Sequence, residues 1–187
     1  MTTTPLSTTT LPLSTGRWAL DKNHSGVFFV VRHLGLSNVR GRFDSFDATL
    51  DVGSSLDEVA VTADVELSSV DTNNPDRDAH LRSTDFFDTD RHPVMTFRST
   101  SVTGAGENYE LAGDLTIAGI TKPVTFDVEF NGIEVFPGDQ STHAGFSGTG
   151  QIRRSDFGID FGIIAGAEKL MLGDKVKVEL DLQFVAP

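Results

Sequence analysis

Histidine is the side chain that most often carries acid–base or metal chemistry near neutral pH. The chain has five histidines and no cysteine: His24, His33, His80, His92 and His143. No two histidines lie two or four residues apart, so no local pair can chelate a metal ion. Thiolate metal sites are excluded because the chain has no cysteine. The sequence therefore predicts no metal site and no cofactor. For His24 and His80 we expect hydrogen bonds that fix a loop or helix, with contact to a ligand head group as the alternative.

Carboxylates and hydroxyls offer no clear catalytic set either. Asp127 and Glu129 share a face of one alternating run, but that face is polar, so solvation explains the pair better than acid–base catalysis does. Ser25 follows His24, yet adjacency in sequence does not make a triad. The nucleophile-elbow, zinc-protease and P-loop motifs are absent from the sequence. We predict no catalytic residues and a protein that is not an enzyme.

Charge restricts the class of partner. Fifteen Lys and Arg stand against 27 Asp and Glu, which gives a formal charge of −12. This balance argues against nucleic acid and anionic lipid surfaces as bulk partners, because phosphate binding needs clustered positive charge. A pyrophosphate head group would need two or more converging arginines, among which Arg153 is a candidate. The net charge favours a neutral head group instead.

The elements that must position these groups are strands, because the dominant hydrophobic period is two. Apolar residues alternate with polar ones, as expected for strands with one buried face. The clearest runs are 59–67, 109–117, 124–130 and 175–184, and weaker ones are 26–33, 41–50, 93–103 and 144–154. Phe43 and Phe46 break the alternation of their run, which indicates a bulge or bend between them.

About eight antiparallel strands in a chain of this length favour closure into a β-barrel, with a β-sandwich as the alternative. An eight-stranded barrel is either filled by its own side chains or holds one small ligand. Two stretches do not alternate. One is Asn73 to Arg82, where Asn74 and Pro75 predict the start of a short helix. The other is 155–173, which we read as a short helix with an apolar loop.

The N-terminal residues differ from the rest of the sequence. Residues 1–15 are rich in Thr, Ser, Leu and Pro and have neither charge nor period, so we expect a flexible extension before a domain over 16–187. No basic segment followed by an apolar run marks a secretion signal, and the expected location is cytoplasmic. No stretch of about 18 apolar residues predicts a transmembrane helix.

Several ordered motifs resemble one known family. They are Trp18 to His33 (WALDKNHSGVFFVVRH), Gly41 to Phe43, Arg77 to Asp88 (RDAHLRSTDFFD), His92 to Phe97 (HPVMTF), Gly113 to Val124 (GDLTIAGITKPV) and Arg153 to Ile159 (RRSDFGI). Together they resemble the YceI family over about residues 17–185. Many members of that family carry a secretion signal, so a periplasmic role is not transferred to this chain.

The resemblance implies a lipocalin-like antiparallel barrel that holds a long apolar molecule, typically a polyisoprenoid, without enzymatic activity. The predicted function is therefore binding, transport or storage of a polyisoprenoid, an isoprenoid quinone or a similar lipid. Two alternatives stay open. One is an enzyme that acts on such a lipid in the same cavity, and the other is a packed interaction protein without a ligand.

The predicted ligand contacts are the apolar residues of the strand faces and of the barrel mouth. They are Phe28, Val30, Phe46, Val65, Leu81, Phe86, Met95, Phe97, Leu115, Ile117, Phe126, Phe146, Phe157, Phe161, Ile164 and Leu172. Fourteen Phe against one Trp and one Tyr suit a wall with few polar tips. Both faces of 26–33 are apolar, so its inward face is not assigned, and burial in a homodimer would explain this.

Overall fold

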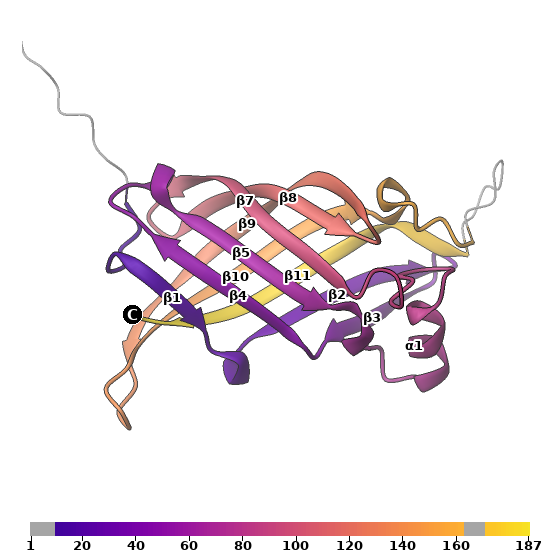
Figure 1. Cartoon of the computed structure of the whole chain (residues 1–187), viewed down its shortest axis with the longest axis horizontal. Coiled ribbons are helices and arrows are strands. Elements are labelled where there is room, and N and C mark those ends of the chain that lie inside the picture. Colours follow the sequence, from indigo (N-terminus) through magenta and orange to yellow (C-terminus); the bar gives the residue numbers. More distant parts are fainter. Residues whose placement is uncertain (1–9, 163–170) are drawn as a thin grey trace, which may run out of the picture.

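The structure is a computed structural model that describes residues 10–162 and 171–187 (Figure 1). Its elements are nearly all antiparallel strands. The strands are β1 (Gly16–Leu20), β2 (Gly26–His33), β3 (Ser37–Phe43), β4 (Phe46–Val52), β5 (Ala60–Glu66), β6 (Val70–Asp71), β7 (Val94–Ala105), β8 (Asn108–Ile117), β9 (Ile120–Val135), β10 (Thr142–Arg153) and β11 (Leu172–Val185). The α-helix is α1 (Pro75–Arg82), and short 3-10 helices are η1 (Lys22–His24), η2 (Leu56–Glu58), η3 (Leu67–Ser69) and η4 (Arg154–Phe157).

These segments form an eight-stranded closed barrel. β1 and β2 both pair with β11 and act as one strand interrupted by η1. β3 with β4, and β5 with β6, are interrupted strands in the same way, because β2 pairs with β3, β1 with β4, β4 with β5, and β3 with β6. The order β4–β5–β7–β8–β9–β10–β11 then closes through β1. The predicted eight-stranded antiparallel barrel is confirmed.

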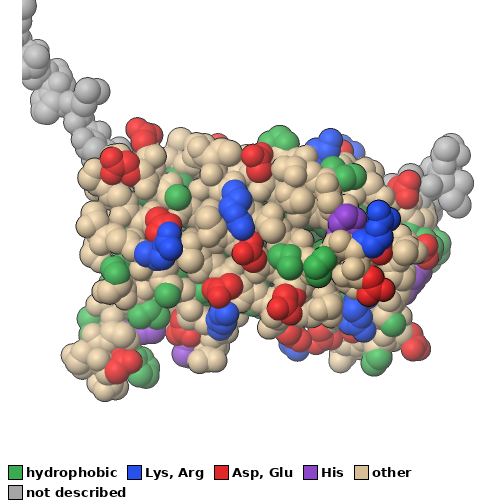
Figure 2. Space-filling view, viewed as in Figure 1, with side chains coloured by type: hydrophobic (Ala, Val, Ile, Leu, Met, Phe, Trp, Pro, Cys, Tyr) green, Lys and Arg blue, Asp and Glu red, His purple; other side chains and the backbone are tan. Residues whose placement is uncertain are grey.

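Alternation along each strand explains why the barrel forms. In β11, Val176, Val178 and Leu180 point into the lumen, whereas Lys177 and Glu179 lie between them on the outer face and pair with each other at 2.7 Å. Acidic and basic side chains are interspersed over the outer face drawn in Figure 2. The break between β3 and β4 at residues 44–45 confirms the bend that Phe43 and Phe46 predict.

Helix α1 lies at one end of the barrel, together with η4 and the β2–β3 turn (Figure 1). The Asn74 side chain accepts a hydrogen bond from the backbone N–H of Arg77 at 3.0 Å, and Pro75 occupies the first turn, as the sequence predicts. Asp78 is 7% exposed and accepts a hydrogen bond from the backbone N–H of Thr72 at 2.9 Å. This bond fixes the helix to the chain that leaves β6. We call this the α1 end.

The opposite end is closed by residues that precede the first strand. Leu11 is 7% exposed and packs in the same apolar cluster as Trp18, which is 1% exposed. The Trp18 Nε1–H donates a hydrogen bond to the Ser14 carbonyl at 2.9 Å. The prediction of a flexible extension over 1–15 is thus wrong at Leu11, because the side chain of Leu11 is buried against the end of the barrel. Residues 1–9 lie outside the described part of the chain.

Within the residues that the structure describes, no helix is long and apolar enough to span a bilayer.

Candidate functional site: an apolar lumen

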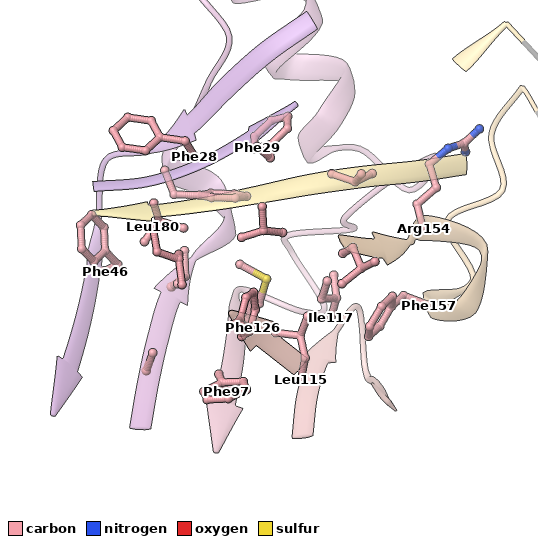
Figure 3. Close-up of a pocket in the computed structure, with 18 of the residues that line it drawn as sticks. Phe28, Phe29, Phe46, Phe97, Leu115, Ile117, Phe126, Arg154, Phe157 and Leu180 are labelled. Carbon is pink, nitrogen blue, oxygen red and sulfur yellow. The ribbon is translucent and has the colours of Figure 1, made fainter. Parts of the chain in front are cut away.

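The main cavity occupies the barrel lumen and has a volume of about 190 Å³ (Figure 3). It extends from mid-barrel residues such as Val61 and Leu111 to Leu81 of α1 and Phe157 of η4. Among the 28 lining residues that lie in the described part of the chain, only Arg154 has a polar side chain. An apolar wall of this kind suits a hydrocarbon chain and offers almost no group that could recognise a polar one.

Most of the predicted ligand contacts lie on this lining. They are Phe28, Phe46, Val65, Leu81, Phe86, Met95, Phe97, Leu115, Ile117, Phe126, Phe157 and Leu172. The lining also includes residues that were not predicted as ligand contacts, such as Phe43 and Val178. Phe43 ends β3 before the bend, and an alternation count restarted within that strand, through Val39 and Gly41, would have found it.

Three predicted contacts lie elsewhere, and a fourth is not described. Val30 pairs with Arg40 and Lys177 across the sheet and is not a lining residue of the cavity. Phe146 lines a second cavity instead. The Phe161 ring packs 5.0 Å from that of Phe86, behind the lining. Ile164 lies outside the described residues.

The register of β2 resolves its two apolar faces. Val27, Phe29 and Val31 line the cavity, and the Phe29 ring lies over Gly41 of β3, which has no Cβ to obstruct it. Phe28 also borders the cavity, although its cross-strand partners are Arg42 and Glu179. Val30 was therefore wrong as a lining residue, because it shares the outer face with charged neighbours.

A second cavity of about 70 Å³ continues the lumen away from the α1 end. Val61, Leu111, Leu180 and Leu182 line both cavities, so the two are stacked along the barrel. Leu11 lines the second cavity, beside residues such as Leu50 and Phe184 that are 4% and 3% exposed. The lumen is thus shut at this end by the N-terminal segment.

Arg154, and not its neighbour Arg153, reaches the cavity. Arg154 is 4% exposed and donates hydrogen bonds from Nε, Nη1 and Nη2 to the carbonyls of Gly173, Ile159 and Leu172 at 2.8–2.9 Å. Burial lowers the pKa of Arg154, and the charges of Asp174 and Asp160 oppose that shift. Three of the guanidinium N–H groups thus hold the chain around the α1 end.

The predicted polar residue Arg153 lies on the outside of the barrel. Its side chain is 57% exposed, and Nη1 lies 3.4 Å from Asp174 Oδ2. Ile152 lines the cavity, and strand alternation then turns the next side chain outward. Alternation from Ile152 would have predicted that Arg154, and not Arg153, faces inward.

The two predicted histidines lie at different places along the barrel. His24 belongs to η1, where β1 gives way to β2, and its Nδ1 lies 2.8 Å from Asp21 Oδ2. The hydrogen bond with His24 is the largest cause that lowers the pKa of Asp21. Ser25 Oγ accepts a hydrogen bond from the Gln183 backbone N–H at 2.9 Å. These hydrogen bonds hold the chain at η1, where the strand formed by β1 and β2 is interrupted.

His80 stands at the α1 end beside the lumen. Its ring packs edge-on against the rings of Phe86 and Phe161, with centroids 5.1 Å and 4.8 Å away. Nε2 lies 2.8 Å from Asp85 Oδ2, and 42% of the side chain is exposed. Since Phe86 lines the cavity, His80 lies next to the cavity wall, although it is not a lining residue itself.

One cluster superficially resembles a catalytic triad, with Ser141 Oγ 2.7 Å from His143 Nε2. However, His143 Nδ1 lies 2.7 Å from the amide nitrogen of Gln183, which can only donate, so Nδ1 must accept. Nε2 then carries the proton and donates it to Ser141, whose hydroxyl donates to Asp139 at 2.6 Å. This imidazole is not poised to deprotonate Ser141. In the described parts of the chain, no three His, Cys, Asp or Glu side chains are grouped to hold a metal ion.

A closed eight-stranded antiparallel barrel around an apolar lumen defines the class of lipocalin-like proteins. The YceI-like domain model matches residues 18–184, and the chain belongs to this family. The UPF0312 protein SA2479 of Staphylococcus aureus is 42% identical over 168 residues, which cover 89% of this chain and 96% of that protein.

Two solved structures share the fold. The Campylobacter jejuni YCEI protein is 30% identical, with a TM-score of 0.71 over 83% of this chain and 90% of that one. A polyisoprenoid binding domain from Saccharophagus degradans has a TM-score of 0.70 over 91% of this chain and 98% of that one. At 17% identity, the second likeness shows the fold alone.

Proposed function

We propose that the protein binds a long-chain lipid, such as a polyisoprenoid or an isoprenoid quinone, in its lumen and carries or stores it without chemical change. The observation that carries this proposal is the lining of the main cavity, which is apolar at every described residue except Arg154. Each buried methylene contributes about 0.8 kcal/mol, so a chain gains affinity with length as long as the lumen accommodates it.

The closed end gives the ligand a direction. Leu11 shuts the second cavity, so the chain enters from the α1 end and its head group stays near His80. Arg154 uses three N–H groups on backbone carbonyls, which supports a neutral head group over a pyrophosphate. A cytoplasmic location and a homodimer stay predictions from the sequence.

Native mass spectrometry followed by organic extraction tests the proposal. We expect freshly purified protein to carry an extra mass that extracts as a prenyl or other long-chain lipid. Delipidated and refolded protein should then take up a polyprenyl or quinone probe with saturation. Failure of saturable uptake for every polyprenyl, quinone and fatty-amide probe would overturn the proposal and shift support to a packed interaction protein.

The closed end also predicts a preference for chain length. Leu11→Ala removes the side chain that ends the lumen, so we expect several-fold tighter binding of the longest chains relative to short ones. A series of prenyl alcohols of increasing length, titrated against the delipidated protein, measures this shift. Leu13→Ala is the matched control, because Leu13 packs on the same cluster but lines neither cavity. An unchanged length profile in Leu11→Ala would contradict the prediction.

A further inference from the structure

The turn between β2 and β3 carries exposed leucines at the α1 end of the barrel. Leu34 is 44% exposed and Leu36 is 79% exposed. The Leu34 backbone N–H donates to the Met171 carbonyl at 2.9 Å, and Met171 is itself 44% exposed. We call Leu34, Leu36 and Met171 the hairpin-tip patch.

The backbone of this turn makes its composition unusual. Leu34 has φ +53° and is followed by Gly35 with φ +70°. Glycine and asparagine adopt this left-handed conformation at low cost, whereas a leucine there is strained. Leu34 is still 44% exposed, so burial offsets only part of this strain. A strained and exposed leucine at a turn tip points to a role at the surface.

The local charge is opposite to that of the whole chain. Residues 22–43 contain Lys22, Arg32, Arg40 and Arg42 and no Asp or Glu, in a chain with a net charge of −12. Close to the tip, Arg32 Nη1 donates to Asn38 Oδ1 at 3.1 Å, and no carboxylate of the described residues pairs with it. Lys22 pairs with Asp47, Arg40 with Glu179, and Arg42 with Asp44 and Asp71. Arg32 is thus the cation beside the tip whose charge no carboxylate of the described residues neutralises.

The patch is continuous with the lumen. Leu172 follows Met171, pairs with His33 at the base of the turn, and lines the main cavity. A chain that leaves the cavity past Leu172 therefore emerges next to exposed leucines. The opposite end offers no such exit, because Leu11 closes it.

We propose that the hairpin-tip patch docks on a phospholipid bilayer that contains anionic lipid, with Leu34 and Leu36 in the interface and Arg32 on lipid phosphates. Apolar side chains flanked by arginine suit this boundary, where hydrocarbon and phosphate lie within a few ångströms. The choice of a bilayer over a protein partner rests on the proposed function, because a long-chain lipid is supplied by and returned to membranes. Docking at this end would place the lumen against the bilayer.

Vesicle flotation with the full chain tests this proposal. We expect the protein to float with vesicles of phosphatidylcholine and phosphatidylglycerol, and to float much less with phosphatidylcholine alone. The double variant Leu34→Asn/Leu36→Asn should lose most of this binding, and it should fold well because asparagine tolerates the φ of Leu34. Arg32→Gln should weaken binding to the anionic vesicles several-fold while the weak binding to neutral vesicles stays as it is.

The matched control is Val135→Asn/Phe136→Asn. These side chains are 50% and 53% exposed at the far end of β9, so the control removes comparable apolar surface without touching the patch. It should float as the unmodified protein does. Equal flotation of the Leu34/Leu36 variant and the unmodified protein overturns the proposal, as does absence of flotation with either vesicle, which would instead favour a protein partner.

Uptake of a prenyl probe added in solution separates the two proposals. The Leu34/Leu36 variant should take up that probe as the unmodified protein does, because neither leucine lines the cavity. Failure of uptake in the unmodified protein would refute the lipid-binding function, whatever the flotation result. Normal uptake without flotation would refute membrane docking alone.

Discussion

Replacement of Ala63 by phenylalanine is expected to reduce lipid affinity about 100-fold or more. Ala63 lies in the middle of β5, pairs with Ala48 and Phe97, and lines the main cavity. A phenyl ring at this position occupies space that about four carbons of a lipid chain would fill. At about 0.8 kcal/mol per methylene, the loss is about 3 kcal/mol, or about two orders of magnitude in Kd.

The barrel should tolerate this change better than a packed core would. Overpacking destabilises a filled interior by about 1–3 kcal/mol, but the new ring at position 63 points into an existing cavity of about 190 Å³. Thermal unfolding of the delipidated variant checks that the fold is kept. Titration with a quinone or prenyl probe then measures the loss of affinity.

Ala60→Phe is the matched control on the same strand. Ala60 is exposed on the outer face of β5, opposite Asp51 of β4, so its ring would stand in solvent. We expect its affinity for the probe to equal that of the unmodified protein. If Ala63→Phe also bound the probe normally, the ligand would not lie in the lumen, and the proposed function would lose its main support.

The barrel could be predicted because its strands are one-sided. In β11 the apolar residues recur at every second position over most of the strand, and only a sheet with one buried face satisfies that pattern. The short strand β1 escaped prediction, since Trp18 and Leu20 are too few for a period to emerge. Its membership of the barrel is decided by pairing with β4 and β11.

Some predicted site residues were wrong because the pattern within one segment does not show which residues of a neighbouring strand lie opposite it. Both Val30 and Val31 are apolar, and only the register, which sets Val30 opposite Lys177, shows that Val31 faces the lumen. Leu11 lies in a stretch without charge or hydrophobic period. It is buried because it packs against the end of the barrel, and its own segment gives no sign of that contact. These residues are specified by tertiary contacts and not by their own segments.

Arg153 and Arg154 illustrate the same limit at the α1 end. The two arginines are adjacent and chemically identical, so composition cannot separate them, and the prediction fell on the exposed one. Arg154 instead begins η4, is buried, and donates to the carbonyls of Ile159, Leu172 and Gly173. A buried cation is tolerated there because three of its N–H groups, which burial removes from water, donate hydrogen bonds to backbone carbonyls.

Arg154→Met is therefore expected to cost about 3 kcal/mol of folding stability. Methionine fills a similar volume, but it leaves the carbonyls of Ile159, Leu172 and Gly173 without their donor, at about 1 kcal/mol or more for each buried one. For a chain of this length, the change corresponds to a fall in Tm of roughly 10 °C. Differential scanning calorimetry of the delipidated protein measures it.

The neighbouring arginine supplies the control for this prediction. Arg153 is 57% exposed and its ion pair with Asp174 spans 3.4 Å, so Arg153→Met should change stability by about 0.5 kcal/mol or less. Equal effects of the two substitutions would show that the buried hydrogen bonds of Arg154 do not hold the α1 end. A large effect confined to Arg154→Met, accompanied by weaker probe binding, would show that the same three bonds that stabilise the fold also keep the entrance of the lumen in shape.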